Sequence, residues 1–254
     1  MAKTIAIVNQ KGGVGKTTTA VNLAACVGKA GKRVLLVDID PQGNATSGLG
    51  VNKKDVLTST YDLLIGEADA ADLRIHTKFS GLDLLPANIN LAGAELELSE
   101  LDNREARIKR FLAPLKADYD YIFLDCPPSL GLITLNALCA VDSVLVPIQC
   151  EYYALEGLSQ LMNTIRQVKR RYNALIELEG VLLTMYDGRL NLTQQVVSEV
   201  KRFFPQKVYA TVIPRNVRLS EAPSFGEPVI YYDKASKGAQ AYDAFAAEFL
   251  KKNR

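Results

Sequence analysis

Short apolar runs alternate along the chain with stretches in which apolar residues recur at helical spacing. The runs at 4–8, 33–38, 121–125, 143–147 and 180–184 are continuous enough to be strands buried on both faces. Helical spacing is clearest over 15–30, 158–168, 196–203 and 242–250. This alternation predicts an α/β fold, a doubly wound and mostly parallel sheet with helices on both faces.

The stretch from Asn44 to Ala113 is the hardest to assign, because it mixes short helical turns with a strand-like run at 82–85. No repeat, low-complexity tract or linker interrupts the chain, so we expect a single domain over 1–254. In the helix around 196–203, we expect Val196, Val197, Val200 and Phe203 to form the apolar face.

Composition narrows the class of protein. The chain has 254 residues, 48% of them hydrophobic, and a net charge of +2, which excludes a disordered acidic protein and a histone-like basic one. No apolar run reaches the roughly 18 residues of a membrane span, and no leader pattern opens the chain, so we expect a cytoplasmic protein. The four cysteines form no C-x-x-C pair and there is one histidine, His76, so we expect buried, reduced thiols.

The charge is unevenly distributed. Residues 166–218 hold ten Lys or Arg against four Asp or Glu, a balance of +6, while the rest of the chain carries −4. Such a region is either a footprint for a polyanion or a set of ordinary solvated helix faces, and charge alone does not decide between them.

A glycine-rich loop stands between the first strand and the first helix. It consists of Lys11, Gly12, Gly13, Val14, Gly15, Lys16, Thr17 and Thr18. The order strand, loop, Lys-Thr and helix is that of a phosphate-binding P-loop, although Gln10 stands where the full template has glycine. Backbone N–H groups and the helix end would bind phosphate, Lys16 would reach the β- and γ-phosphates, and the Thr17 hydroxyl would bind Mg²⁺.

Further motifs extend the pattern over nearly the whole chain. They are Val37-Asp-Ile-Asp-Pro-Gln-Gly-Asn44, Asp125-Cys-Pro-Pro-Ser129, Gln149-Cys-Glu-Tyr-Tyr-Ala154 and Val212-Ile-Pro-Arg-Asn-Val-Arg-Leu-Ser-Glu-Ala-Pro-Ser224. With these, the chain resembles the ParA/Soj partition ATPases, P-loop NTPases with a deviant Walker A motif. The resemblance implies ATP and Mg²⁺ as cofactors and a "signature" lysine, Lys11, that reaches across a dimer interface.

The resemblance also implies roles for residues outside the loop. Asp40 would orient the attacking water, and Asp38 would lie near the Mg²⁺ shell. Asp125, after the apolar run 121–124, has the position of a Walker B carboxylate that holds Mg²⁺. Pro214 and Asn216 would contact adenine, and Glu151 would meet the partner's ribose or signature lysine.

The function implied is ATP-dependent chromosome or plasmid partition. ATP would drive formation of a homodimer that binds double-stranded DNA without sequence preference and associates with the nucleoid. A ParB/Spo0J-type centromere-binding protein would stimulate an otherwise slow hydrolysis; a role in replication initiation stays open. We expect the phosphate contacts at Arg189, Arg218, Lys201 and Arg202.

A membrane-surface switch of the MinD kind shares the same ATPase core and is the alternative. It would need an amphipathic membrane helix. We instead expect Tyr242, Phe245, Phe249 and Leu250 to form the core face of the last helix, and therefore no stable membrane association. An Fe–S carrier would need paired cysteines, which the sequence does not offer.

Overall fold

The structure is a computed structural model that describes residues 1–66, 68–151 and 154–254. Its centre is an eight-stranded sheet in the order β3-β4-β2-β5-β1-β6-β7-β8. The strands are β1 (Lys3–Ile7), β2 (Val34–Asp38), β3 (Ile75–His76), β4 (Leu82–Leu85), β5 (Tyr121–Asp125), β6 (Ser143–Gln149), β7 (Glu177–Tyr186) and β8 (Val208–Pro214). Within the described residues every neighbouring pair is parallel except β3 and β4. The predicted doubly wound, mostly parallel sheet is thus confirmed.

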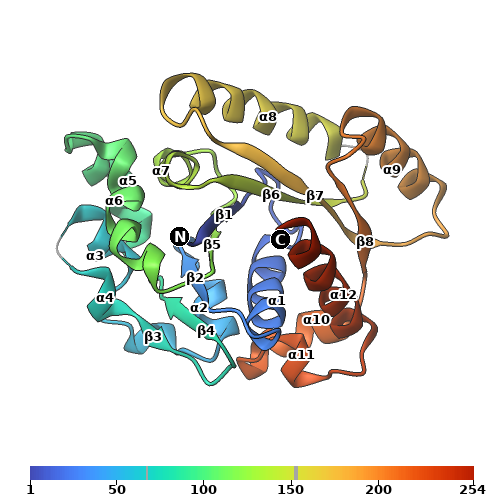
Figure 1. The fold of residues 1–254 in the computed structure, drawn as a ribbon, viewed down its shortest axis with the longest axis horizontal. Coiled ribbons are helices and arrows are strands. Elements are labelled where there is room, and N and C mark those ends of the chain that lie inside the picture. Colours follow the sequence, from blue (N-terminus) through green and yellow to red (C-terminus); the bar gives the residue numbers. More distant parts are fainter. Residues whose placement is uncertain (67, 152–153) are drawn as a thin grey trace.

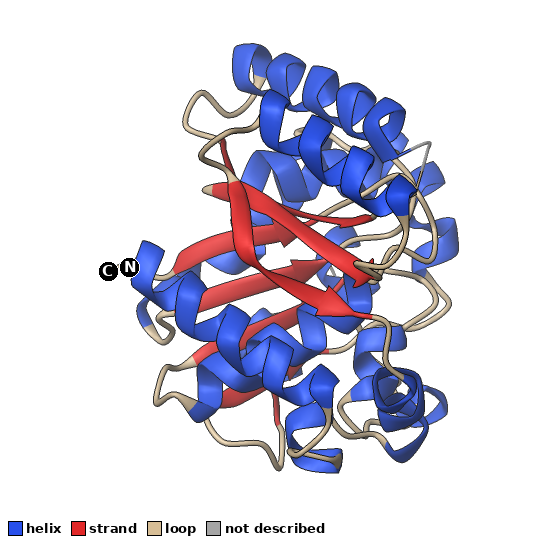
Figure 2. Cartoon of the chain, turned by 90° about the vertical axis from the view of Figure 1, so that its right-hand side faces the viewer, coloured by secondary structure: helices blue, strands red, loops and turns tan. Residues whose placement is uncertain are grey.

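Helices cover both faces of the sheet (Figures 1 and 2). On one face lie α1 (Lys16–Lys29), α2 (Asn44–Gly48), α10 (Val217–Glu221), α11 (Val229–Tyr232) and α12 (Lys237–Lys252). On the other lie α3 (Thr60–Ile65), α4 (Ala70–Leu73), α5 (Leu91–Glu100), α6 (Arg107–Leu112), α7 (Leu132–Ala140), α8 (Ala154–Arg171) and α9 (Asn191–Phe203). Short 3₁₀ helices occur at Lys53–Asp55, Arg104–Ala106, Ala113–Ala117 and Ala222–Phe225. The stretch from Asn44 to Ala113, which is hard to assign from the sequence, therefore folds in its described part into short helices around β3 and β4.

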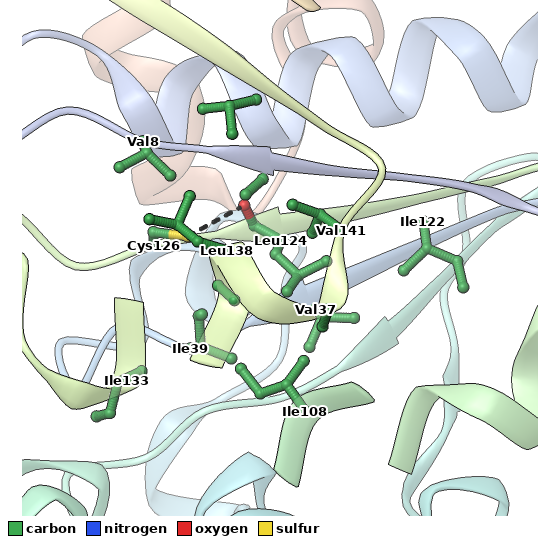
Figure 3. Packing of buried hydrophobic residues seen from close by; sticks show 14 of the residues in the cluster. Val8, Val37, Ile39, Ile108, Ile122, Leu124, Cys126, Ile133, Leu138 and Val141 are labelled. Carbon is green, nitrogen blue, oxygen red and sulfur yellow. Dashed lines mark hydrogen bonds between the residues drawn. The ribbon is translucent and has the colours of Figure 1, made fainter. Parts of the chain in front are cut away.

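Each face of the sheet has its own hydrophobic core. Figure 3 shows part of the larger one, where Val37 and Leu124 of β2 and β5, and Val8 and Ile39 directly after β1 and β2, pack in one cluster with Ile108 of α6. The other core contains Tyr242, Phe245 and Phe249 of α12, which are fully or almost fully buried as expected. All four cysteines are also buried. Among the described residues, no helix is both long and apolar enough to cross a bilayer.

One expected core residue lies outside the core. Val196 and Val200 of α9 are buried, but Phe203 is 62% exposed. Phe203 is the last residue of the helix, and the residue after it, Phe204, packs against the core instead. The guanidinium of the neighbouring Arg202 lies over the ring, 5.9 Å from its centroid. The placement of Phe203 on the apolar face was therefore wrong.

Candidate nucleotide site

The carboxyl ends of the central strands bring the predicted site residues to one edge of the sheet. The loop after β1 joins α1 there, and the segments after β2, β5, β6, β7 and β8 end beside it. In open parallel sheets this edge is where ligands bind. The fold thus gathers segments that lie up to about two hundred residues apart in the sequence.

The glycine loop has the backbone that a phosphate cradle needs. Gly13 and Gly15 have positive φ values of 75° and 86°, which few side chains other than hydrogen allow. Gly15 is also the N-cap of α1, and no side chain in this described part of the chain caps that helix end. The first N–H groups of α1 are therefore available to an anion.

Lys16 begins α1 and is 7% exposed. Its Nζ donates a hydrogen bond of 3.1 Å to the carbonyl oxygen of Lys11, so it arches over the loop. Burial lowers the pKa of the ammonium, and the nearby carboxylates of Asp125 and Asp40 act in the opposite direction. A buried cation that forms no ion pair among the described residues is suited to bind a phosphate.

Two side chains brace the loop from behind. The Asn9 amide donates to the carbonyl oxygen of Pro147 in β6 at 2.8 Å. The hydroxyl of Thr184 in β7 donates to the carbonyl oxygen of Val14 at 2.8 Å. Sequence reasoning singled out neither residue, although a polar residue at the end of an apolar run, as at Thr184, was a usable signal.

Asp38 and Asp125 lie fully buried on neighbouring strands, in register with each other. Asp38 accepts hydrogen bonds from the N–H and hydroxyl of Thr46, at 2.8 and 2.7 Å, and from the N–H of Asp40 at 3.2 Å. Neither oxygen of Asp125 has a partner at hydrogen-bonding geometry among the described residues.

Burial raises the pKa of both carboxyls, that of Asp38 to about 6. For Asp125 the charge of Asp38 adds to the effect, while the nearby Thr17 side chain and Lys16 oppose it. Two buried carboxylates beside a threonine hydroxyl fit Mg²⁺, which prefers oxygen ligands and keeps phosphates and waters in its shell. Among the described residues no three His, Cys, Asp or Glu form a complete metal site by themselves. This donor set therefore fits an ion that arrives with a phosphate ligand.

Asp40 lies just beyond the end of β2 and is nearly buried. Its Oδ1 accepts the N–H of Gln42 at 2.9 Å. Because β2 ends at Asp38, the two aspartates do not share a strand face; the hydrogen bond from the Asp40 N–H to Asp38 keeps them together instead.

A pocket of about 540 Å³ opens beside the glycine loop. Gly15 and Thr18 form one wall, and Pro214 and Asn216, the residues predicted to contact adenine, form another. The Asn216 Oδ1 accepts the N–H of Arg218 at 3.1 Å and so begins α10. The pocket also contains Thr184, Met185 and Tyr242, whose hydroxyl lies 3.1 Å from that of Thr19 in α1. A mostly apolar pocket next to a phosphate cradle has the layout of a nucleotide site.

Lys11 is paired within its own chain. Its Nζ lies 2.5 Å from Oε2 of Glu151, and Gln149 donates to the other oxygen of that carboxylate. The lysine therefore points toward the end of β6 rather than over its own loop. Tyr152 and Tyr153, which belong to the motif that follows, lie outside the described residues.

The four cations expected to contact DNA fall into two groups. Arg189 is 88% exposed and forms a fork with Asp187, at 2.9 and 2.6 Å. Arg218 pairs with Glu221 and Asp233. These two arginines follow the carboxyl ends of β7 and β8. Lys201 and Arg202 are exposed at the far end of α9, about 15 Å farther along the helix axis, near the start of β8. Arg189 and Arg218 therefore lie at the edge of the sheet that holds the nucleotide pocket, and Lys201 and Arg202 lie farther from it.

The chain is similar to known proteins over most of its length. A family model described as the AAA domain matches residues 2–178. The sporulation initiation inhibitor protein Soj of Bacillus subtilis is 62% identical over 248 residues, 98% of each chain. The chromosome partitioning protein ParA of Myxococcus xanthus is 54% identical over 253 residues, which cover 100% of this chain and 89% of that one.

A solved structure shares the fold and carries a nucleotide. It is the cobyrinic acid a,c-diamide synthase of Mycobacterium smegmatis with bound ATP analogue and magnesium. The two chains are 39% identical with a TM-score of 0.90, over 100% of this chain and 96% of that one. The likeness spans the whole sheet and both layers of helices.

Proposed function

Because this chain belongs to the Soj/ParA family of chromosome-partitioning ATPases, we propose that it is a slow, Mg²⁺-dependent ATPase whose ATP-bound homodimer binds DNA. Its cofactors are ATP and Mg²⁺. The observation that carries the proposal is the buried Asp125 carboxylate. It lies beside Lys16 and the glycine loop, and neither of its oxygens has a hydrogen-bond partner among the described residues. A buried unpaired charge is costly unless a ligand compensates it.

Each residue has a role in that reaction. Lys16 and the N–H groups at the start of α1 bind the β- and γ-phosphates, and Pro214 and Asn216 hold the adenine. Thr17, Asp38 and Asp125 hold Mg²⁺, which, when bound, neutralises phosphate charge. The Asp40 carboxylate orients the attacking water and accepts its hydrogen bond.

Dimerisation depends on Lys11. In the single chain its ammonium pairs with Glu151, and in the ATP dimer it contacts the partner's phosphate instead. Glu151 then lies at the interface, where it meets the partner's ribose or signature lysine. A centromere-binding protein of the ParB/Spo0J type stimulates hydrolysis and so releases the dimer from the nucleoid. The protein acts in the cytoplasm.

The DNA contacts are contacts to backbone phosphates. Arg189 and Arg218 lie at the same edge of the sheet as the nucleotide, so a change in nucleotide state can move them. Two such surfaces in a dimer bind one duplex more tightly than either surface alone, because the second contact is intramolecular. Lys201 and Arg202 add a more distant contact on each subunit.

The test is binding of a random-sequence duplex with ATP, ADP and no nucleotide. We expect tight binding only with ATP, a steep fall in affinity with salt, and a loss of about tenfold or more in Arg189→Ala and Arg218→Ala. Arg33→Ala is the matched control, because Arg33 is also exposed and paired with an acid, Asp120.

Equal DNA binding with ADP and ATP would contradict the proposal. ATP-dependent binding to anionic vesicles in place of DNA would favour the membrane switch of the MinD kind. The apolar residues of α12 are buried in the core, so α12 itself is not available as a membrane-binding helix.

A further inference from the structure

The carboxyl end of β7 departs from regular strand geometry where it borders the nucleotide pocket. Leu183 is in register with Val212 of β8, and Tyr186 is in register with Pro214. Three steps along β7 thus match two steps along β8, so β7 holds one extra residue, a β-bulge. Bulges are rare in parallel pairs and concentrate next to active sites, where they redirect side chains.

The bulge brings two consecutive residues to one pocket. Successive side chains of a regular strand point to opposite faces. Thr184 and Met185 nevertheless both line the pocket that adjoins the glycine loop. Met185 has a φ of +48°, and among the described residues only Asn103 is another non-glycine with positive φ. Asparagine tolerates this conformation and methionine does not, so the backbone at Met185 is strained.

Thr184 fixes one peptide of the glycine loop. Its hydroxyl donates to the carbonyl oxygen of Val14 at 2.8 Å, and both residues are only 2% exposed. Carbonyl oxygen and N–H of a trans peptide point in opposite directions. With the Val14 oxygen held against β7, the N–H of Gly15 points away from β7.

We propose that the bulge of Thr184 and Met185 is a positioning element of the nucleotide site. Thr184 sets the orientation of the Val14–Gly15 peptide, so that the Gly15 N–H is ready to bind phosphate. Met185 forms the part of the pocket wall between the glycine loop and the segment of Pro214 and Asn216. This inference rests on the proposed function, because it assigns the pocket to ATP.

The first test removes the hydroxyl alone. In Thr184→Val the carbonyl oxygen of Val14 loses its hydrogen-bond donor. The loop then relaxes so that this oxygen can accept a hydrogen bond from water instead. Nucleotide binding must then return the loop to its original conformation, and the free energy that this costs weakens the affinity. We expect the dissociation constant of a non-hydrolysable ATP analogue with Mg²⁺ to rise about tenfold in calorimetry. Turnover at saturating ATP should change less, by about threefold at most, because Thr184 does not touch the reacting atoms. Thr184→Ser keeps the hydroxyl and should bind within about twofold of wild type.

The second test uses the strained backbone at Met185. Met185→Gly relieves the positive φ but removes the side chain from the pocket, so we expect a higher melting temperature together with a weaker affinity for the analogue, by about fivefold. Asn103→Gly is the control: it changes the other positive-φ residue, which lies outside the pocket, and should leave the affinity unchanged.

The outcomes separate the inference from the proposed function. Absence of ATP binding in the wild type would overturn both. Wild-type binding with unchanged affinity in Thr184→Val would overturn the role of Thr184, even if the melting temperature falls. A Met185→Gly variant that binds as wild type would overturn the role of Met185.

Discussion

Replacing Lys11 by alanine should leave the single chain almost intact and yet prevent the ATP dimer. In the single chain Lys11 pairs with Glu151 at 2.5 Å, with the two side chains 38% and 46% exposed. Exposed pairs of this kind contribute about 0–1 kcal/mol, because water screens them. For a chain of this size the melting temperature should therefore fall by no more than about 4 °C.

The effect on the dimer should be much larger. A hydrogen bond to a charged group contributes about 1.5–3 kcal/mol. In a twofold-symmetric dimer each contact occurs twice, so Lys11→Ala removes about 3–6 kcal/mol. That weakens dimerisation by roughly 10² to 10⁴.

Sedimentation velocity with ATP and Mg²⁺ measures this, in an Asp40→Ala background that prevents hydrolysis. Lys78→Ala is the control, since Lys78 also forms an exposed ion pair, with Glu227, away from the nucleotide pocket. If the Lys11→Ala, Asp40→Ala protein dimerises at the same concentrations as Asp40→Ala alone, Lys11 does not contact the partner's nucleotide.

Four further substitutions test other parts of the molecule. Lys16→Ala should abolish ATP binding in calorimetry, whereas Asp40→Ala should keep binding and lose phosphate release, because only the water is affected; normal hydrolysis in Asp40→Ala would refute its role. Gly12→Val should fold and bind ATP but stay monomeric in sedimentation, because a Cβ at Gly12 meets nothing within 4 Å in the single chain, whereas the proposed dimer would bring two such loops close together; a dimer would count against that interface. Burial acts to raise the pKa of Glu179, but hydrogen bonds from Lys3 and two polar neighbours outweigh it and hold the pKa below its ordinary 4.5. Its contribution to stability is thus present above pH 4.5 and lost as the pH falls through the lowered pKa. Glu179→Gln should therefore destabilise the protein by about 1–3 kcal/mol in urea unfolding at pH 7 and much less at pH 3; an equal loss at both pH values would contradict this reading.

The central sheet could be read from the sequence because its strands are buried on both faces. The runs that correspond to β1, β2, β5 and β6 are continuous and apolar, and the predicted strand bounds agree with the observed ones to within a few residues. β8 was missed because it is an edge strand in which only Tyr209 and Ile213 are buried, and Thr211 interrupts its apolar residues. The short helices between Asn44 and Ala113 are set by packing against the sheet rather than by a long periodic pattern.

The site was predictable where a motif is local and unpredictable where it depends on register. Lys16 and Thr17 follow from the glycine loop itself. The bulge at Met185 follows from a one-residue mismatch between β7 and β8, which no local pattern encodes. Likewise, the ion pair of Lys11 with Glu151 joins residues 140 positions apart.

The buried ionisable groups at the phosphate end of the site destabilise the protein when no ligand is bound. Burial raises the pKa of Asp38 and Asp125, and the pair lies beside a lysine whose own pKa burial lowers. For each of these groups, burial disfavours the charged form and is the largest influence on the pKa. Mg²⁺ would compensate the two carboxylates and the phosphates would compensate Lys16, so ligand binding relieves unfavourable burial on both sides at once. The bound and empty forms therefore differ in the free energy of several buried charges, not of one surface contact, which is a large enough difference to drive the dimerisation that we propose.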